Sequence, residues 1–326
     1  MIITRTPLRI SLGGGGTDLP SFYEQAGGFI IAAAISRYIY IGINRMFEPG
    51  YFLKYSDVEN VLALHEVKHP IFREVLSRHD GQGHIEIASL ADVPAGTGLG
   101  SSGAFTVGLL KAMYEHKRQH PSAEALAQEA CDIEINVLRR AVGKQDQYIA
   151  AIGGLTCFDF RPDGSVDIKP LVLSTGTLID LESNLLMFFT GYSRDADRVL
   201  SDQRERSKCA ETSMMQNLLF VKQLGLAAKD ALESGDTRQY AALMREHWAH
   251  KQARSCGITS GPINDLHALG MANGALGGKL VGAGGGGYLL FYAEDPVRLR
   301  RAMGRAGLNE LRFRFDHDGA VVMARD

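Results

Sequence analysis

The stretch that decides the fold runs from Pro94 to Ala104 and reads P-A-G-T-G-L-G-S-S-G-A. It follows an apolar run at 84–88 and precedes a predicted helix. Its three glycines permit positive φ and let backbone N–H groups approach an anion, and a helix start adds the positive end of its dipole. Taken alone, the stretch fits a phosphate-binding turn about as well as it fits a flexible linker or a tight helix entry.

Two common nucleotide motifs do not fit this stretch. No G-K-[ST] follows, so it is not a Walker A loop, and no early strand and downstream acid frame it as a Rossmann fingerprint. Ser101 and Ser102 nevertheless supply hydroxyls for a phosphate oxygen or for Mg²⁺. The sequence therefore favours a phosphate loop of another kind.

Two further glycine-rich runs support phosphate binding. Residues 7–18 read P-L-R-I-S-L-G-G-G-G-T-D, and residues 279–291 read K-L-V-G-A-G-G-G-G-Y-L-L-F. Three such runs in this order, with P-x-x-x-G-L-G-S-S in the middle, resemble the three motifs of the GHMP kinases. The G-K-Q-D-Q-Y run at 143–148 resembles the sugar-1-kinase branch of that family. Galactokinases carry G-E-H-T-D where this chain has G-G-G-T-D, which argues against galactose.

The resemblance implies an α+β fold with two domains. Residues 1–180 would form an α+β domain with a left-handed crossover, and residues 181–326 a ferredoxin-like domain. The implied activity is transfer of a phosphoryl group from ATP, with Mg²⁺, to the anomeric hydroxyl of a sugar. D-glycero-D-manno-heptose 7-phosphate is the expected acceptor. A kinase of a neutral sugar such as L-fucose, or a non-catalytic sugar- and nucleotide-binding regulator, are the alternatives.

The resemblance also assigns the catalytic and metal residues. Asp146 matches the aspartate that accepts a proton from the sugar hydroxyl or orients it, although an Asp at such a place is more often a cap or a solvated turn residue. Arg9 matches a basic position that could keep Asp146 ionised or lower the pKa of the attacking hydroxyl. Ser102 and Glu134 are the expected Mg²⁺ ligands. Glu129 competes with Glu134, which is preferred for its twelve-residue spacing to Asp146.

The remaining site residues are expected in three groups. The nucleotide phosphates are expected on Pro94, Gly96, Thr97, Gly98, Leu99, Gly100, Ser101 and Ser102. The sugar is expected on Gly15, Gly16, Thr17, Asp18, Lys144, Gly284, Gly285 and Gly286. A phosphate on the acceptor needs local cations, expected at Arg194, Lys251 and Arg254, although a solvated basic helix face is an equal alternative.

Composition limits the partners. The formal charge of −2, from 35 basic and 37 acidic side chains, provides no global field for nucleic acid or anionic lipid. Four widely spaced cysteines predict reduced thiols in a cytoplasmic protein. The first twenty residues lack a signal-peptide pattern, and the apolar window at 29–43 is too short to span a bilayer. That window predicts one or two buried strands.

Periodicity predicts the other elements. Pro121 and Ser122 start a helix over 122–140, and the single tryptophan, Trp248, is expected in a core. Later helices are expected at 194–234 and 237–253. Strands are expected at 2–3, 8–12, 154–160, 166–173, 185–191, 279–281, 288–293, 311–315 and 321–324.

Overall fold

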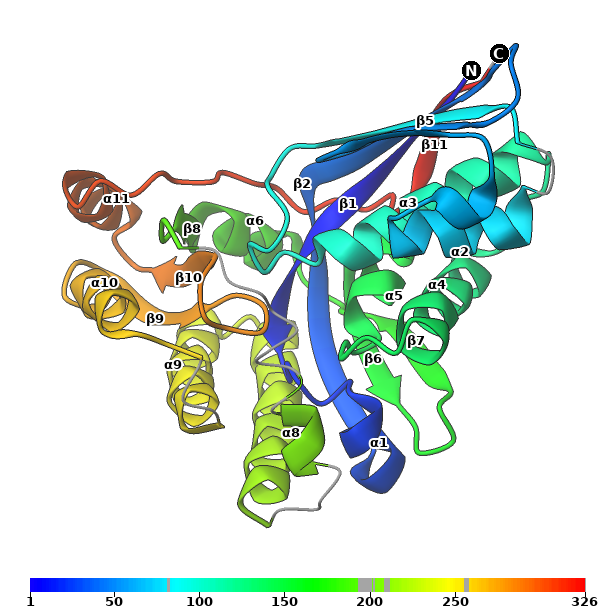
Figure 1. The fold of residues 1–326 in the computed structure, drawn as a ribbon. Helices are drawn as coiled ribbons and strands as arrows, with labels where there is room; N and C mark the ends of the chain where they lie inside the picture. Colours follow the sequence, from blue (N-terminus) through cyan, green and yellow to red (C-terminus); the bar gives the residue numbers. More distant parts are fainter. Residues whose placement is uncertain (81–82, 193–200, 202, 208–211, 255–257, 326) are drawn as a thin grey trace.

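The computed structural model describes residues 1–326 except 81–82, 193–200, 202, 208–211, 255–257 and 326 (Figure 1). Two sheets, one large and one small, lie side by side with helices packed on both. Within the described ranges, no helix has the length and apolar character needed to cross a membrane.

Two long antiparallel strands form the centre of the large sheet. Strand β1 (Ile2–Gly13) pairs with β2 (Gly28–Arg45), and helix α1 (Pro20–Ala26) lies between them in the chain. The two short runs predicted at 2–3 and 8–12 are therefore one strand, which continues through a register shift at Pro7/Leu8. The window at 29–43 is likewise a single strand, and its buried run of isoleucine and alanine explains its length.

The rest of the large sheet is built around these two strands. The strand order is β11-β1-β2-β5-β3-β4, with β6 pairing β2 and β7 pairing β6. The β3–β5 pair is parallel and the other pairs are antiparallel. The additional strands are β3 (Tyr51–Lys54), β4 (Val58–Val61), β5 (Ile85–Ala91), β6 (Leu155–Phe160), β7 (Val166–Pro170) and β11 (Val321–Arg325).

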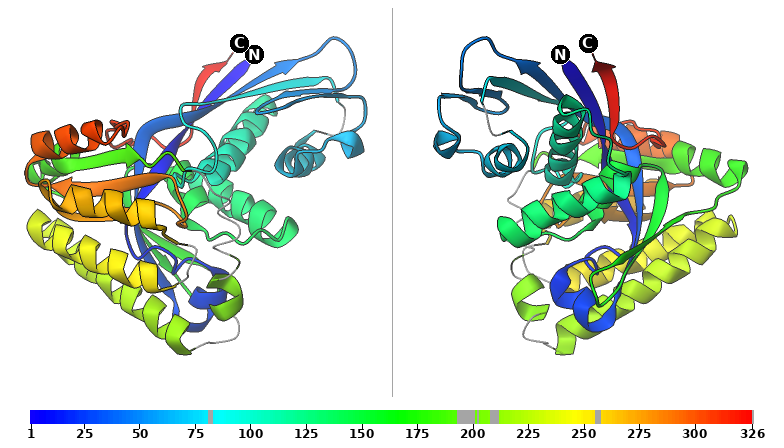
Figure 2. Two further views of the ribbon diagram at one scale, coloured as in Figure 1. Left: turned by 60° about the vertical axis from the view of Figure 1, so that its left-hand side comes forward. Right: turned by 90° about the vertical axis from the view of Figure 1, so that its right-hand side faces the viewer.

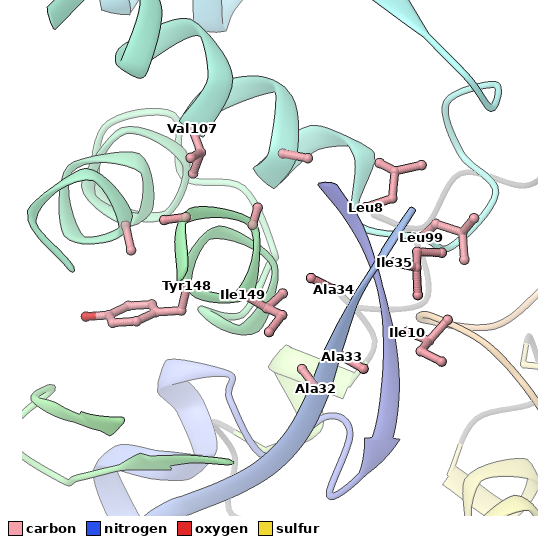
Figure 3. Close-up of a cluster of buried hydrophobic side chains, with 14 of the residues drawn as sticks. Leu8, Ile10, Ala32, Ala33, Ala34, Ile35, Leu99, Val107, Tyr148 and Ile149 are labelled. Atoms are coloured by element: carbon pink, nitrogen blue, oxygen red, sulfur yellow. The ribbon is translucent and has the colours of Figure 1, made fainter. Parts of the chain in front are cut away.

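Helices cover the large sheet and bury its core. Helices α3 (Ser101–His116) and α5 (Gln145–Ile152) both pack on β1 and β2. Figure 3 shows the apolar cluster between them, which includes Leu99 at the end of the glycine loop. The same region contains η1 (Leu64–Glu66), α2 (Pro70–His79), α4 (Ala123–Cys131) and the π-helical segment η2 (Asp132–Val137). The helix predicted at 122–140 is confirmed up to Val137.

The small sheet has three antiparallel strands in the order β8-β10-β9. Helix α9 packs on β9 and on α8, and α10 packs on β9 and on α11. Trp248 is buried in the core of this region, as predicted. The elements are α6 (Thr175–Asn184), β8 (Leu185–Phe189), α8 (Thr212–Glu233), α9 (Thr237–Arg254), α10 (Gly261–Met271), β9 (Ala275–Leu280), β10 (Tyr288–Ala293) and α11 (Pro296–Arg305).

The strand predicted at 311–315 is wrong. This segment crosses from one sheet to the other, so no single neighbour pairs along its length. At one end Leu311 N donates to Met187 O of β8, and at the other Asp316 N donates to Ala34 O of β2. Strand β11 then pairs with β1, which brings both chain ends to one edge of the large sheet (Figure 2). The domain boundary near residue 180 stays a prediction.

Candidate active site

The glycine loop before α3 has the backbone that its sequence predicts. Gly96, Gly98 and Gly100 all have positive φ, and Gly100 is the N-cap of the helix. Thr97 Oγ1 donates to Pro94 O at 2.9 Å and closes the turn. The loop therefore presents the positive end of a 16-residue helix beside glycines that let an anion approach the backbone.

The third glycine run lies directly against this loop. A Cβ at Gly282 would lie 2.6 Å from Gly98 Cα, so the two backbones touch. Gly284 and Gly285 instead contact Ile258, and Gly285 N donates to Ile258 O at 2.7 Å. The residues of this run that line the cavity containing Asp146 are Lys279, Leu280, Val281, Gly282 and Ala283. Substrate contacts by Gly284, Gly285 and Gly286 remain predictions.

Asp146 and Arg9 form an ion pair next to the glycine loop. Arg9 Nη2 lies 2.7 Å and Nε 2.8 Å from Asp146 Oδ1, and Arg9 Nη1 donates to Gly98 O at 2.5 Å. Gln145 Nε2 also donates to Oδ1, at 3.3 Å. None of these contacts involves Oδ2. The pair thus links β1, α5 and the loop. It orients the Asp146 carboxylate through Oδ1 and leaves Oδ2 able to accept a hydrogen bond or a proton.

The first glycine run brings a second carboxylate to the same cavity. Asp18 is buried and its Oδ2 accepts from Gln145 N at 3.0 Å. Burial raises the pKa of Asp18, an effect that this backbone bond opposes. A Cβ at Gly143 would collide with the Asp18 carboxylate, so glycine is required there. The Thr17 hydroxyl is fully buried and hydrogen-bonds to the backbone. Its Oγ1 lies 2.9 Å from both Gly14 O and Phe29 O, each of which can accept its proton.

Ser102 and Glu134 meet at the start of α3. Ser102 Oγ donates to Glu134 Oε2 at 2.5 Å, and Gln147 Nε2 donates to Oε1 at 2.8 Å. Arg140 Nη1 lies 2.5 Å from Ser102 Oγ and 3.0 Å from Glu134 Oε2. Burial raises the pKa of Glu134, whose side chain is 0 % exposed. Glu129 points elsewhere and accepts bonds from the side chains of His79 and Tyr114.

This pair suits a magnesium ion. A hydroxyl and a carboxylate oxygen converge beside a phosphate loop, and Mg²⁺ takes oxygen donors while keeping several waters. Arg140 Nη1 lies against the same two oxygens, so they attract a positively charged group in this structure. Ser102 and Glu134 would hold the ion.

Cations surround the cavity in which Asp18 and Asp146 lie. This cavity of about 100 Å³ is lined by Arg9, Lys251, Arg254 and Lys279, together with His247. Lys251 Nζ donates to Leu280 O at 2.9 Å and to Gly282 O. Arg254 Nη1 donates to Gly15 O at 3.2 Å. The structure thus brings Lys251 and Arg254 to the glycine runs and rules out a solvated basic face for them, since both are buried.

One predicted substrate residue, Lys144, lies apart from this cavity. Lys144 Nζ donates to Gly164 O at 2.5 Å and lies over the Tyr23 ring, 4.8 Å from its centroid. It lines a neighbouring cavity of about 720 Å³ that shares Leu19 and Val142 with the first. Arg194 lies outside the described residues.

Lys279 is a site residue that the sequence analysis missed. It follows two glycines in β9 and its Nζ donates to Leu12 O at 3.2 Å. A charged side chain inside a buried strand, directly before the third glycine run, is the signal that could have found it. Arg140, His247 and Ser11 carry no comparable signal, because only tertiary structure brings them to the site.

Lys279 gives the stability of the protein a specific pH dependence. Burial and the nearby Arg9 lower the pKa of Lys279 to about 7. An unfolded lysine titrates near pH ~10.4, so between these values the unfolded chain binds a proton that the folded chain lacks, and stability rises with pH. We expect Lys279→Met to raise the melting temperature near neutral pH, and this gain to shrink as the pH approaches about 10.

Thermal unfolding of both proteins, followed at several pH values without ligand, checks this expectation. Lys169→Met is the matched control, since Lys169 is 65 % exposed and its replacement should give no pH-dependent gain. A gain for Lys279→Met that stays constant across the pH range would show that Lys279 is not the titrating group.

Comparisons with known proteins agree with this geometry. Residues 66–154 match the GHMP kinases N terminal domain and residues 228–309 match the GHMP kinases C terminal domain. The chain belongs to the GHMP kinase family, and it has the two-domain fold of that family. It is therefore a phosphotransferase.

Particular relatives are similar over nearly the whole chain. D-glycero-alpha-D-manno-heptose 7-phosphate kinase of Campylobacter jejuni is 28% identical, over 91% of this chain and 90% of that protein. L-fucokinase/L-fucose-1-P guanylyltransferase of Bacteroides fragilis is 25% identical, over 92% of this chain and 35% of that protein. The crystal structure of a D-glycero-D-manno-heptose 1-phosphate kinase from Bacteroides thetaiotaomicron shares the fold, with a TM-score of 0.83, 24% identity and full coverage of both chains.

Proposed function

We propose that the protein is an ATP- and Mg²⁺-dependent kinase of the anomeric hydroxyl of a sugar, with D-glycero-D-manno-heptose 7-phosphate as the acceptor. The observation that carries this proposal is the position of the Asp146–Arg9 pair. It joins a phosphate loop on one side to a cation-lined cavity with a second carboxylate on the other. Such an arrangement serves a reaction between a nucleotide phosphate and an anionic acceptor. The product would feed nucleotide-activated heptose synthesis in the cytoplasm, where ATP is available.

The reaction needs placement and charge neutralisation more than covalent chemistry. The anomeric oxygen of the sugar attacks the terminal phosphorus of ATP, the bond to ADP breaks, and the hydroxyl proton passes to Asp146. Since Arg9 holds Oδ1, Oδ2 is the oxygen that would receive this proton. Asp18 would accept hydrogen bonds from sugar hydroxyls, and the backbone of the loop at 94–102 would bind the nucleotide phosphates. A bound Mg²⁺ would neutralise phosphate charge next to Ser102 and Glu134.

A neutral sugar is the alternative acceptor, and the fucokinase relatives favour it. The cavity argues for the phosphorylated one. Four basic side chains line it, and only two carboxylates, Asp18 and Asp146, oppose them. Burial lowers the pKa of Lys251 and of Lys279, which shows that the cavity without an anion disfavours their charged forms. Burying an excess of positive charge is costly unless a ligand anion compensates it. An anionic acceptor would favour the charged forms of these lysines, whereas a neutral sugar would not.

The test is a plain ATP-consumption assay with a panel that contains heptose 7-phosphate, the corresponding heptose, L-fucose and galactose. ³¹P NMR of the product shows which oxygen is phosphorylated. Turnover of heptose 7-phosphate to a 1,7-bisphosphate supports the proposal. If L-fucose is turned over faster than heptose 7-phosphate, L-fucose is the acceptor instead. Binding of sugar and nucleotide without any turnover would indicate the regulator.

The magnesium assignment predicts a change in metal dependence. We expect Ser102→Ala and Glu134→Gln to raise the Mg²⁺ concentration for half-maximal activity by about tenfold or more, because each removes or weakens an oxygen ligand. Activity at fixed ATP, measured over a range of free Mg²⁺, gives this value. Glu129→Gln is the matched control, since Glu129 belongs to the adjoining helix but bonds to His79 and Tyr114. A shift in Glu129→Gln and none in Glu134→Gln would reverse the assignment.

A further inference from the structure

Three buried polar atoms around the first glycine run have no hydrogen-bond partner within the described part of the chain. They are Ser11 Oγ, His247 Nε2 and Arg254 Nη2. All three residues line the cavity that contains Asp146. An unsatisfied buried polar group destabilises the fold, so three in one place indicate that a ligand completes them.

These atoms gather where the backbone carries no side chain. A Cβ at Gly15 would lie 3.2 Å from Ser11 Oγ and 3.9 Å from His247 Cε1, and a Cβ at Gly16 would collide with Arg254 Nη1. Gly16 also has a positive φ of 98°. Glycine at both positions keeps Ser11, His247 and Arg254 close together, as an oxyanion with several oxygens requires.

The charge around this cluster favours an anion. Burial lowers the pKa of Arg254 to about 10, so its guanidinium is positive at neutral pH. Burial and the neighbouring Lys279, Arg254 and Lys251 lower the pKa of His247, which is therefore a neutral imidazole able to donate from one nitrogen. Asp18 is the acidic group that acts on Arg254, and its own pKa is raised by burial.

The nucleotide phosphates do not need this cluster. They have the backbone of the loop at 94–102, which packs on Asp146 through Gly100, where a Cβ would lie 3.2 Å from Asp146 Cγ. The cluster lies instead at Gly15–Gly16, next to Asp18. We propose that Ser11, His247 and Arg254 form a binding site for the phosphate that the acceptor already carries. The inference rests on the proposed kinase function and adds the residues that would select a sugar phosphate over a free sugar.

The first experiment measures inorganic phosphate binding by calorimetry to enzyme saturated with Mg²⁺ and ADP, so that the nucleotide site is filled. We expect Arg254→Met to weaken this binding about tenfold or more and Ser11→Ala about threefold, as loss of a charged and of a neutral hydrogen bond predicts. Arg245→Met is the matched control, because Arg245 is an exposed arginine of the same helix and should leave binding unchanged. Thermal unfolding checks that each variant folds. If Arg254→Met does not fold, the phosphate affinity of Ser11→Ala tests the site.

The second experiment compares kinetics with heptose 7-phosphate. Ser11→Ala should raise KM for the sugar phosphate while kcat and KM for ATP stay close to those of the parent, since a remote contact contributes binding. Parent affinity for phosphate in both Ser11→Ala and Arg254→Met would overturn the site. Equal KM values for heptose and heptose 7-phosphate in the parent protein would also overturn the phosphate site, but they would not contradict the proposed kinase activity. Phosphate binding as expected, without turnover of heptose 7-phosphate, would support the site and refute the acceptor.

Discussion

Replacing Asp146 with asparagine is expected to lower kcat by about two orders of magnitude or more, while nucleotide binding changes little. The amide keeps the shape of the carboxylate but cannot accept the proton of the sugar hydroxyl. It also loses the charge that Arg9 neutralises through Nε and Nη2. The proposed nucleotide contacts lie on the loop at 94–102, which this substitution leaves in place.

Single-turnover kinetics and ADP binding on the same preparation measure the two effects separately. Asp265→Asn is the control, because Asp265 is an exposed aspartate of α10 far along the chain from the loop. Near-normal kcat in Asp146→Asn at saturating substrate would show that another group receives the proton.

Gly103→Ala should reduce kcat by about 100-fold although it replaces no residue that reacts. This loss is expected if the added methyl group displaces Asp146 by about 1 Å. In the first turn of α3, a Cβ at Gly103 would lie 2.7 Å from Asp146 Cβ and 3.0 Å from Asp146 C. These are backbone-fixed atoms rather than the end of a flexible chain, so α5 and Asp146 must move. Alanine is the better helix former by about 1 kcal/mol, but overpacking costs about 1–3 kcal/mol.

Gly304→Ala is the matched substitution for this test. Gly304 is also a helical glycine, in α11, and nothing lies within 4 Å of the Cβ it would gain. It should keep full activity and melt slightly higher, whereas Gly103→Ala should lose activity even where it remains folded. Equal activity of the two variants would mean that Asp146 tolerates displacement.

The parts of the site that the sequence predicts are those that are local in the chain. The loop at 94–102 carries its own glycines and its own helix start, and the structure has the expected positive φ values at Gly96, Gly98 and Gly100. Glu134 is preferred to Glu129 because its twelve-residue distance to Asp146 resembles that of the galactokinase branch. The structure brings Ser102 to Glu134, as the magnesium hypothesis requires.

The anion cluster could not be predicted in the same way. Ser11 belongs to β1, whereas His247 and Arg254 belong to α9, and they meet only because α8 and α9 pack beside the large sheet. Lys144 shows the opposite error of sequence reasoning. It adjoins Gln145 and Asp146 in the chain, yet its side chain turns away to Tyr23 and Gly164. Adjacent residues at the start of a helix point in different directions.

The pairing of β11 with β1 has a consequence for how the chain is made. A ribosome makes β1 long before β11, so until β11 is made the outer edge of β1 has no partner and exposes its backbone N–H and C=O groups. The neighbouring segment at 311–316, which bonds to both sheets, is also absent until then. A nascent or truncated chain that ends near residue 180 would therefore carry an open strand edge, the kind of surface that chaperones protect from aggregation.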